Sequence, residues 1–169
     1  LPERAWNHGV SLSKNFRFLN KNSTLTMDYY ETIFINQVIV DYEEEGSLSF
    51  YNLEGESSAK SFQVTLDISL TPQLEFISAY KNDIVLIDYR SGRKQKQLVP
   101  KNRFFTNLSW NSIKNTKNQQ WKYDFTINGI GSQRMVENSS NPNFNQSPSF
   151  SLINTQLTRV FSDFSEIYI

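Results

Sequence analysis

Strict alternation of apolar and polar residues is the feature that most constrains how this chain can fold. Residues 61–70 read SFQVTLDISL, so an apolar side chain stands at every second position and Gln, Thr, Asp and Ser lie between them. Successive side chains of a β-strand point to opposite faces, and such a segment therefore has one apolar and one polar face. No stretch of useful length shows the 3.6-residue period of an amphipathic helix. The pattern predicts an all-β protein.

The same alternation recurs along the whole chain and predicts about eight strands. The predicted strands are residues 6–18, 25–35, 61–70, 74–89, 102–110, 120–130, 149–161 and a last one that begins at residue 166. Most of them run for roughly 10 to 14 residues. That is longer than the usual strand of a globular protein, and it matches a tilted strand that spans a membrane.

The links between the predicted strands alternate between short and long. Short links are expected near residues 19–23, 71–73, 111–118 and 162–165, and long links near residues 36–58, 85–101 and 131–147. Outer-membrane barrels have this asymmetry, with short periplasmic turns at one end and long extracellular loops at the other. A β-sandwich with crossing connections does not require it. The chain is therefore predicted to be an antiparallel up-and-down meander that forms about eight strands of a transmembrane β-barrel.

Composition indicates the environment of each face of these strands. Aromatic residues make up 14% of the chain, apolar residues only 38%, and 17 basic residues balance 17 acidic ones. The polar faces are rich in Asn, Ser, Thr, Gln and Asp and poor in Lys and Glu, which favours a wet or plugged lumen. The alternative is a soluble ligand-binding β-barrel module whose apolar faces turn inward. The balanced charge gives no field that would attract nucleic acid.

Six phrases along the chain carry a family resemblance. They are LPERAWNHGVSLSKNFRF, STLTMDYYETIFINQVIVDYE, FYNLEGESSAKSFQVTLD, KQLVPKNRFFTNLSW, WKYDFTINGIGSQRM and SPSFSLINTQLTRVF. In consistent order and over nearly the whole chain, they resemble the C-terminal barrel region of TonB-dependent outer-membrane receptors of the Bacteroidetes type. The resemblance implies active uptake of a scarce nutrient, such as a metal chelate, cobalamin or an oligosaccharide. It also implies a position in the cell outer membrane, in contact with its lipid.

The resemblance further implies that residues 1–169 are part of a larger barrel. Such receptors have about 22 barrel strands, a plug domain through which they contact TonB, and further strands after a segment like the terminal EIYI. The plug domain and the final strands have no counterpart in this sequence. We therefore expect the chain to be a fragment that stops within a strand and depends on the missing parts for transport.

Candidate ligand-binding residues lie in the three predicted long links. The first link holds the acidic run DYEEEG, the second a basic run around a Ser-Gly turn, and the third a polar stretch rich in Asn and Ser. The candidates are Asp41, Tyr42, Glu43, Glu44, Glu45, Arg90, Arg93, Gln133 and Arg134. Carboxylates suit a cationic or metal-bearing ligand, arginines suit a carboxylate or phosphate, and amides suit a sugar or siderophore. Each run also fits an ordinary solvated loop.

No arrangement in the sequence predicts an enzyme. The chain has no cysteine and a single histidine, His8, which leaves no thiolate site and no multi-histidine metal site. The acidic run lacks the D-x-[DN]-x-[DN]-G spacing of a calcium loop. We find no Ser/His/Asp arrangement, no glycine-rich phosphate loop and no suitable pair of carboxylates. We expect no catalytic residue and no cofactor.

Overall fold

The computed structural model describes residues 2–44, 46–136, 145–162 and 165–169. The long strands are β1 (Arg4–Phe18), β2 (Lys21–Asn36), β5 (Ser57–Thr71), β6 (Leu74–Tyr89), β8 (Asn102–Asn111), β9 (Gln120–Ile130) and β10 (Phe150–Ser162), and β11 (Ser165–Tyr168) is short. A further short strand, β7 (Gly92–Gln95), pairs with the end of β6, and β3 (Val38–Asp41) forms a separate hairpin with β4 (Ser49–Asn52). Within these described residues, no helix is long and apolar enough to cross a membrane.

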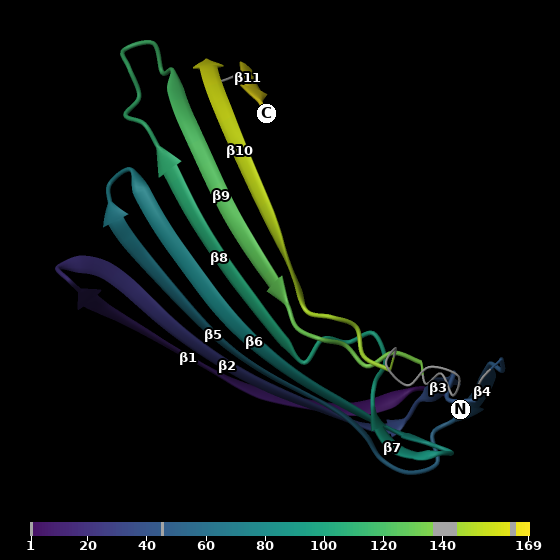
Figure 1. Cartoon of the computed structure of the whole chain (residues 1–169). Helices are drawn as coiled ribbons and strands as arrows, with labels where there is room; N and C mark the ends of the chain where they lie inside the picture. Colours follow the sequence, from purple (N-terminus) through teal and green to yellow (C-terminus); the bar gives the residue numbers. More distant parts are fainter. Residues whose placement is uncertain (1, 45, 137–144, 163–164) are drawn as a thin grey trace.

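The main sheet is an antiparallel meander, as the sequence predicts. Its order is β1-β2-β5-β6-β8-β9-β10-β11, so every long strand pairs with the next long strand along the chain. Figure 1 shows one broad, curved layer, with β1 at one edge and β10 and β11 at the other. In the described part of the chain, β1 and β11 are the two ends of this order and do not pair with each other. The structure is therefore an open meander, and closure into the predicted barrel is not seen.

Short and long links lie at opposite ends of the sheet. One short link is Leu19–Asn20, where both residues have positive φ, 50° and 63°, as a two-residue turn of the hairpin type requires. Pro72 and Gln73 form the next short link, between β5 and β6. The other end of the sheet carries the long links, which contain β3, β4 and β7 (Figure 1).

Strand register sorts the alternating residues onto two faces. Leu12 lies opposite Met27, and Met27 lies opposite Val64 on the next strand. Residues that lie directly opposite in an antiparallel pair share a face, so these side chains belong to one apolar face. On the other face Ser13 lies opposite Thr26, and their hydroxyl oxygens are 3.2 Å apart. The predicted division into an apolar and a polar face is thus present across the sheet.

The apolar face is largely exposed. Leu12 exposes 65% of its surface, and in the described residues the buried apolar side chains are confined to Ile39, Ile68, Ile87 and Tyr89. The accessible surface is 11607 Å², whereas a compact monomer of this mass would expose roughly 8,600 Å². The chain thus exposes much more surface than a compact protein of its mass, and large apolar side chains are part of that surface.

Gly9 makes room on the polar face for the ring of Tyr30, which lies opposite it. A Cβ atom at Gly9 would lie 2.3 Å from Tyr30 Cδ1 and 2.7 Å from the carbonyl oxygen of Tyr29. We expect Gly9→Ala to lower the free energy of unfolding by about 1–3 kcal/mol, as overpacking usually does. Urea titration measures this loss, and adding Tyr30→Ala should recover part of it. An unchanged urea midpoint in Gly9→Ala would contradict the tight contact.

Candidate functional site

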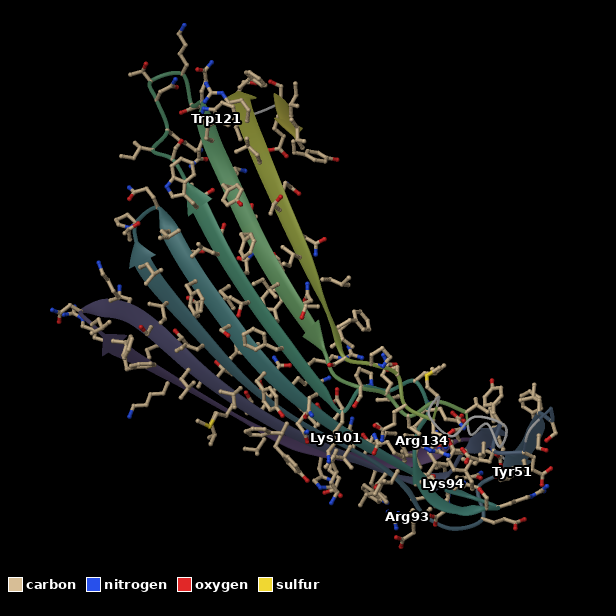
Figure 2. The ribbon with its side chains drawn as sticks, in the orientation of Figure 1. Tyr51, Arg93, Lys94, Lys101, Trp121 and Arg134 are labelled. Atoms are coloured by element: carbon tan, nitrogen blue, oxygen red, sulfur yellow. The ribbon has the colours of Figure 1, made fainter. Side chains whose placement is uncertain are left out.

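Most of the candidate residues gather at the end of the sheet that carries the long links. Figure 2 shows Tyr51, Lys94 and Arg134 close together at this end, where the three links meet. The second and third links are joined by a backbone hydrogen bond, in which Leu98 N donates to the carbonyl oxygen of Arg134 at 2.9 Å. The links therefore form one assembly that presents side chains from distant parts of the sequence.

The carboxylate of Glu43 ties the three links together. It accepts hydrogen bonds from Lys94 Nζ at 2.7 Å and from Gln97 Nε2 at 2.6 Å, and it also accepts one from the guanidinium of Arg134. Only 2% of the Glu43 side chain is exposed. Glu43 belongs to the first link, Lys94 and Gln97 to the second, and Arg134 to the third. We call these four residues the Glu43 cluster. Their hydrogen bonds and ion pairs join the three links to one another.

Asp41 and Arg90 lie beside this cluster and contact the same tyrosine. Asp41 is buried and accepts hydrogen bonds from the Tyr51 hydroxyl and from Glu43 N. The Arg90 guanidinium lies 4.3 Å from the centre of the Tyr51 ring, and Arg90 N donates to the Tyr51 hydroxyl at 3.1 Å. Burial raises the pKa of Tyr51, and its hydrogen bond to Asp41 raises that pKa further. Tyr51, whose hydroxyl is held by Asp41, therefore joins the β3–β4 hairpin to the start of the second link.

Arg93 lies apart from the Glu43 cluster. Its guanidinium is 3.6 Å from Glu56 Oε2 and 3.7 Å from Asp88 Oδ1. Because the arginine side chain is exposed, these ion pairs contribute little to stability. Asp88 also accepts a hydrogen bond from Glu56 N at 2.7 Å, beside Gly55, whose φ is +133°. Asp88 thus joins the end of the first link to the end of β6, and Arg93 lies beside this contact.

The remaining candidates are not part of one charged site. Tyr42 is exposed, and Glu44 is exposed and accepts a hydrogen bond from the hydroxyl of Ser47. Gln133 pairs through its backbone with Ser147. Glu45 lies outside the described residues. The role of these residues in binding a ligand stays a prediction.

An apolar cavity of about 630 Å³ opens beside the Glu43 cluster. Its walls come from all three links and include Val40, Leu98 and Val136. Two polar side chains of the second link, Lys96 and Gln97, also line it. Gln97 donates to Glu43, so the Glu43 cluster fixes the position of this one wall residue. Pockets of this size and apolar character are the usual shape of small-molecule sites.

Tyr89 lies beneath the loops, in a small apolar core that it forms with Ile39 and Ile87. Only 6% of its surface is exposed. Burial raises the pKa of Tyr89 to about 12, and the negative charge of Glu43 contributes to the increase. The tyrosine therefore stays neutral at the loop end at physiological pH.

This pKa predicts how the loop end responds to alkali. An unfolded tyrosine loses its proton near pH 10, whereas folded Tyr89 holds it until about pH 12. The free energy of unfolding should therefore be flat below about pH 10 and fall by roughly 2 kcal/mol between pH 10 and 12. Comparing urea midpoints of the wild type and Tyr89→Phe across this range checks the effect. An identical alkaline decline in the two proteins would contradict it.

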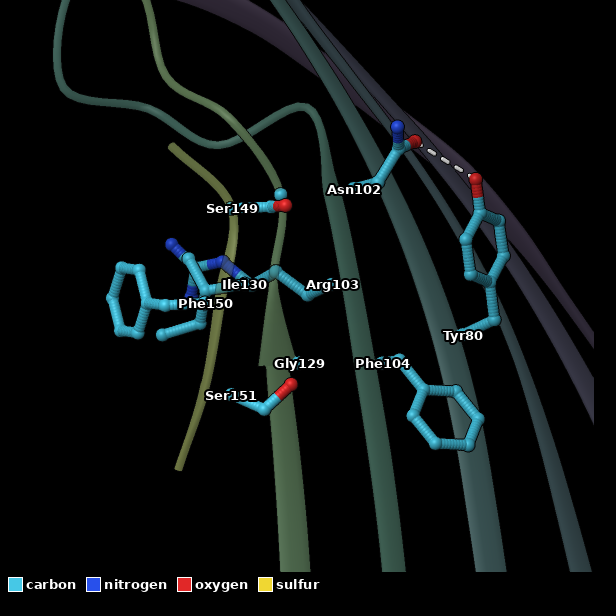
Figure 3. A pocket seen from close by; sticks show the side chains of 10 residues that line it. Tyr80, Asn102, Arg103, Phe104, Gly129, Ile130, Ser149, Phe150 and Ser151 are labelled. Atoms are coloured by element: carbon cyan, nitrogen blue, oxygen red, sulfur yellow. Dashed lines mark hydrogen bonds between the residues drawn. The ribbon is translucent and has the colours of Figure 1, made fainter. Parts of the chain in front are cut away.

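A second, shallower hollow lies on the sheet itself. It has a volume of about 440 Å³ and is lined by Phe104 and Gly129, among others (Figure 3). At its rim the Tyr80 hydroxyl donates to Asn102 Oδ1 at 2.8 Å, and Asn82 Nδ2 donates to the same oxygen at 2.7 Å. These polar groups at the rim already hydrogen-bond to one another. The hollow is therefore a weaker candidate for a ligand site than the cavity between the loops.

Sequence reasoning missed several residues of the loop end. Gln97, Tyr51 and Tyr89 carry no local signature, and the apolar cavity arises only when the three links meet. One signal was available, because the first link carries an acidic run and the second a basic run. Opposite charge in two links at the same end of a meander favours their contact.

The loop end thus combines a closed charge cluster with an adjoining apolar cavity. Among the described residues, no group of three or more His, Cys, Asp or Glu side chains could hold a metal ion. No protein-family model matches this chain, and neither a curated protein nor a solved structure matches it.

Proposed function

We propose that this chain forms part of the barrel wall of a TonB-dependent outer-membrane receptor that takes up a scarce nutrient. The observation that carries the proposal is the exposed apolar face of long antiparallel strands, whose short turns lie at one end and long links at the other. Transmembrane β-barrels have this combination, because each strand faces lipid on one side and the lumen on the other.

The apolar face has the features of a surface in contact with lipid. At the end with short turns, Trp110 lies opposite Tyr123, and the Arg159 guanidinium lies 4.8 Å from the ring centre of Trp121. Trp6 is exposed near the start of β1, toward the end of the sheet that carries the long links. Aromatic side chains favour both borders of a bilayer, where the ring meets lipid and its polar atom meets water. An apolar band between aromatic borders supports the membrane assignment.

The polar face supports a water-filled or plugged lumen. Its side chains hydrogen-bond across strands, as Asn107 Nδ2 does to Thr126 Oγ1 at 2.9 Å. The charged groups on this face are of both signs, and Lys81 Nζ lies 3.2 Å from Asp83 Oδ1. A wall of this kind is hydrophilic without a strong field, which suits the interior of a large barrel.

The proposal assigns different tasks to the two ends of the sheet. The loop end faces the outside of the cell and contacts the nutrient, while the turn end faces the periplasm. Coupling to TonB runs through a plug domain that is not part of this chain. Further strands next to β1 and β11 complete the barrel, and they satisfy the backbone groups that stay unpaired at the edges of an open sheet.

Fractionation of cells that produce the protein tests this function. An antibody raised against the chain should detect a band much larger than 19.7 kDa, in the outer-membrane fraction, and that band should resist an alkaline carbonate wash. A band near 19.7 kDa in the soluble fraction would contradict the proposal. It would favour the soluble ligand-binding module instead.

A further inference from the structure

The loop end exposes apolar side chains that a lipid bilayer does not explain. Val38, Val40, Leu98 and Val136 are all exposed, and all four line the same cavity. They belong to β3 and to the second and third links, which lie beyond the end of the long strands (Figure 1). Exposed apolar side chains that gather around one hollow are typical of a binding site.

The backbone around the cavity is held in a conformation that a leucine rarely adopts. Leu98 has a φ of 58°, in the left-handed region, and 63% of its surface is exposed. The contacts on either side enforce this geometry, since Leu98 N donates to the Arg134 carbonyl and neighbouring Gln97 donates to Glu43. Backbone strain that the surroundings impose is common at ligand contacts. Here it places an apolar side chain at the cavity.

Lys96, the cation in the cavity wall, does not take part in the ion pairs with Glu43 that engage the nearby cations. Lys94 and Arg134 both bind Glu43. Lys96 is exposed at the cavity, and within the described residues its ammonium group has no ion pair. The carboxylates of Asp41 and Glu43 are already engaged with donors of the loop end. The charge that the cavity offers to a ligand is therefore positive.

We propose that this cavity binds an amphipathic organic anion, with its apolar body between Val40 and Leu98 and its anionic group at Lys96. The volume of about 630 Å³ falls within the range of roughly 300–1,000 Å³ that encloses drug-sized molecules. The inference rests on the proposed function, because it takes the loop end as the side that faces water, and it adds the chemical class of the ligand.

Photolabelling of the full protein that contains this chain, reconstituted in phospholipid bilayers, tests the inference. The probe is a medium-chain fatty acid with a diazirine in its chain, and mass spectrometry locates the labelled residues. Labelling of residues 38–42 and 96–99 should saturate and should be competed by excess unlabelled fatty acid. Labelling of the apolar sheet face should rise without saturation, because lipid-facing positions sample the probe from the bilayer. Absence of saturable labelling at the loops would overturn the inference.

Two matched pairs of variants locate the contact. Leu98→Asn should raise the concentration for half-maximal loop labelling about tenfold, the effect of losing most of one leucine contact. Leu19→Asn is its control, because Leu19 also has a positive φ and is 79% exposed, but lies at the opposite end of the sheet. Asparagine tolerates this backbone conformation, so both variants keep their turns. Equal effects of the two substitutions would overturn the apolar contact.

The second pair tests the anionic group. Lys96→Gln should raise the half-maximal concentration about two- to fivefold for the fatty acid, and should leave labelling by its methyl ester unchanged. Lys114→Gln, an exposed lysine at the turn end, should change neither. An equal loss for the acid and the ester in Lys96→Gln would overturn the assignment of Lys96.

The same data separate a failure of this inference from a failure of the proposed function. Labelling of the sheet face without saturable labelling of the loops would contradict the cavity proposal but would remain consistent with the proposed function. Saturable labelling of the loops without any labelling of the sheet face contradicts the membrane wall and supports the cavity.

Discussion

Replacing Glu43 by alanine is expected to separate the three long links and to lower the free energy of unfolding by about 3–5 kcal/mol. The carboxylate is almost fully buried and receives donors from Lys94, Gln97 and Arg134. Without it, two partly buried cations lose the anion that they share, and a buried charge whose partner is removed is strongly destabilising. Hydrogen exchange of the amides in residues 38–43 and 96–98 measures the loosening directly.

Glu44 provides a matched control for this prediction. It carries the same charge in the same acidic run but is exposed, so Glu44→Ala should change stability by less than about 0.5 kcal/mol. Glu43→Gln, which keeps the shape and loses the charge, should fall between the two. Equal hydrogen-exchange rates for the amides of residues 38–43 and 96–98 in Glu43→Ala and Glu44→Ala would contradict the prediction that the Glu43 cluster joins the links.

Placing arginine at Val64 is expected to destabilise the protein by about 2–4 kcal/mol when it folds into a bilayer, as charges on the lipid face of a barrel do. Val64 lies on central strand β5, between Met27 and Tyr80 on the apolar face. Arginine at the next residue, Thr65, points to the polar face and should cost no more than about 1 kcal/mol. Urea titration of folding into phospholipid vesicles compares the two. Equal losses would contradict lipid contact at Val64.

The strands were predictable because alternation with a period of two is a direct consequence of backbone geometry. The predicted strand at residues 74–89 has the same bounds as β6, and the segment at 61–70 lies inside β5 (Ser57–Thr71). The pairing of strands across the short links was predictable as well, since short links join antiparallel neighbours.

The shorter strands could not be recognised in the same way. β3, β4 and β7 have four residues each, and alternation over so few positions is also common in loops. The alternation also could not predict whether the sheet closes into a barrel. It determines which side of a strand is apolar, but it does not determine how many strands complete a barrel.

The composition of the loop end was predictable, but its pairings were not. The acidic and basic runs signalled that the first two links attract each other. That Glu43, and not Glu44, is the buried carboxylate depends on how the β3–β4 hairpin is placed and on Arg134, which is 91 residues further along the chain. Contacts of this kind follow from three-dimensional packing, which no local window of sequence contains.

Single cysteines along β5 test most directly whether the apolar face meets lipid. The chain has no cysteine of its own, so each introduced thiol reports its own position. In the bilayer-embedded protein, a water-soluble maleimide should label cysteines at residues 63, 65 and 67 and should fail to label those at residues 62, 64 and 66. Labelling of both sets, or of the even-numbered set alone, would contradict a membrane wall with its polar face toward water.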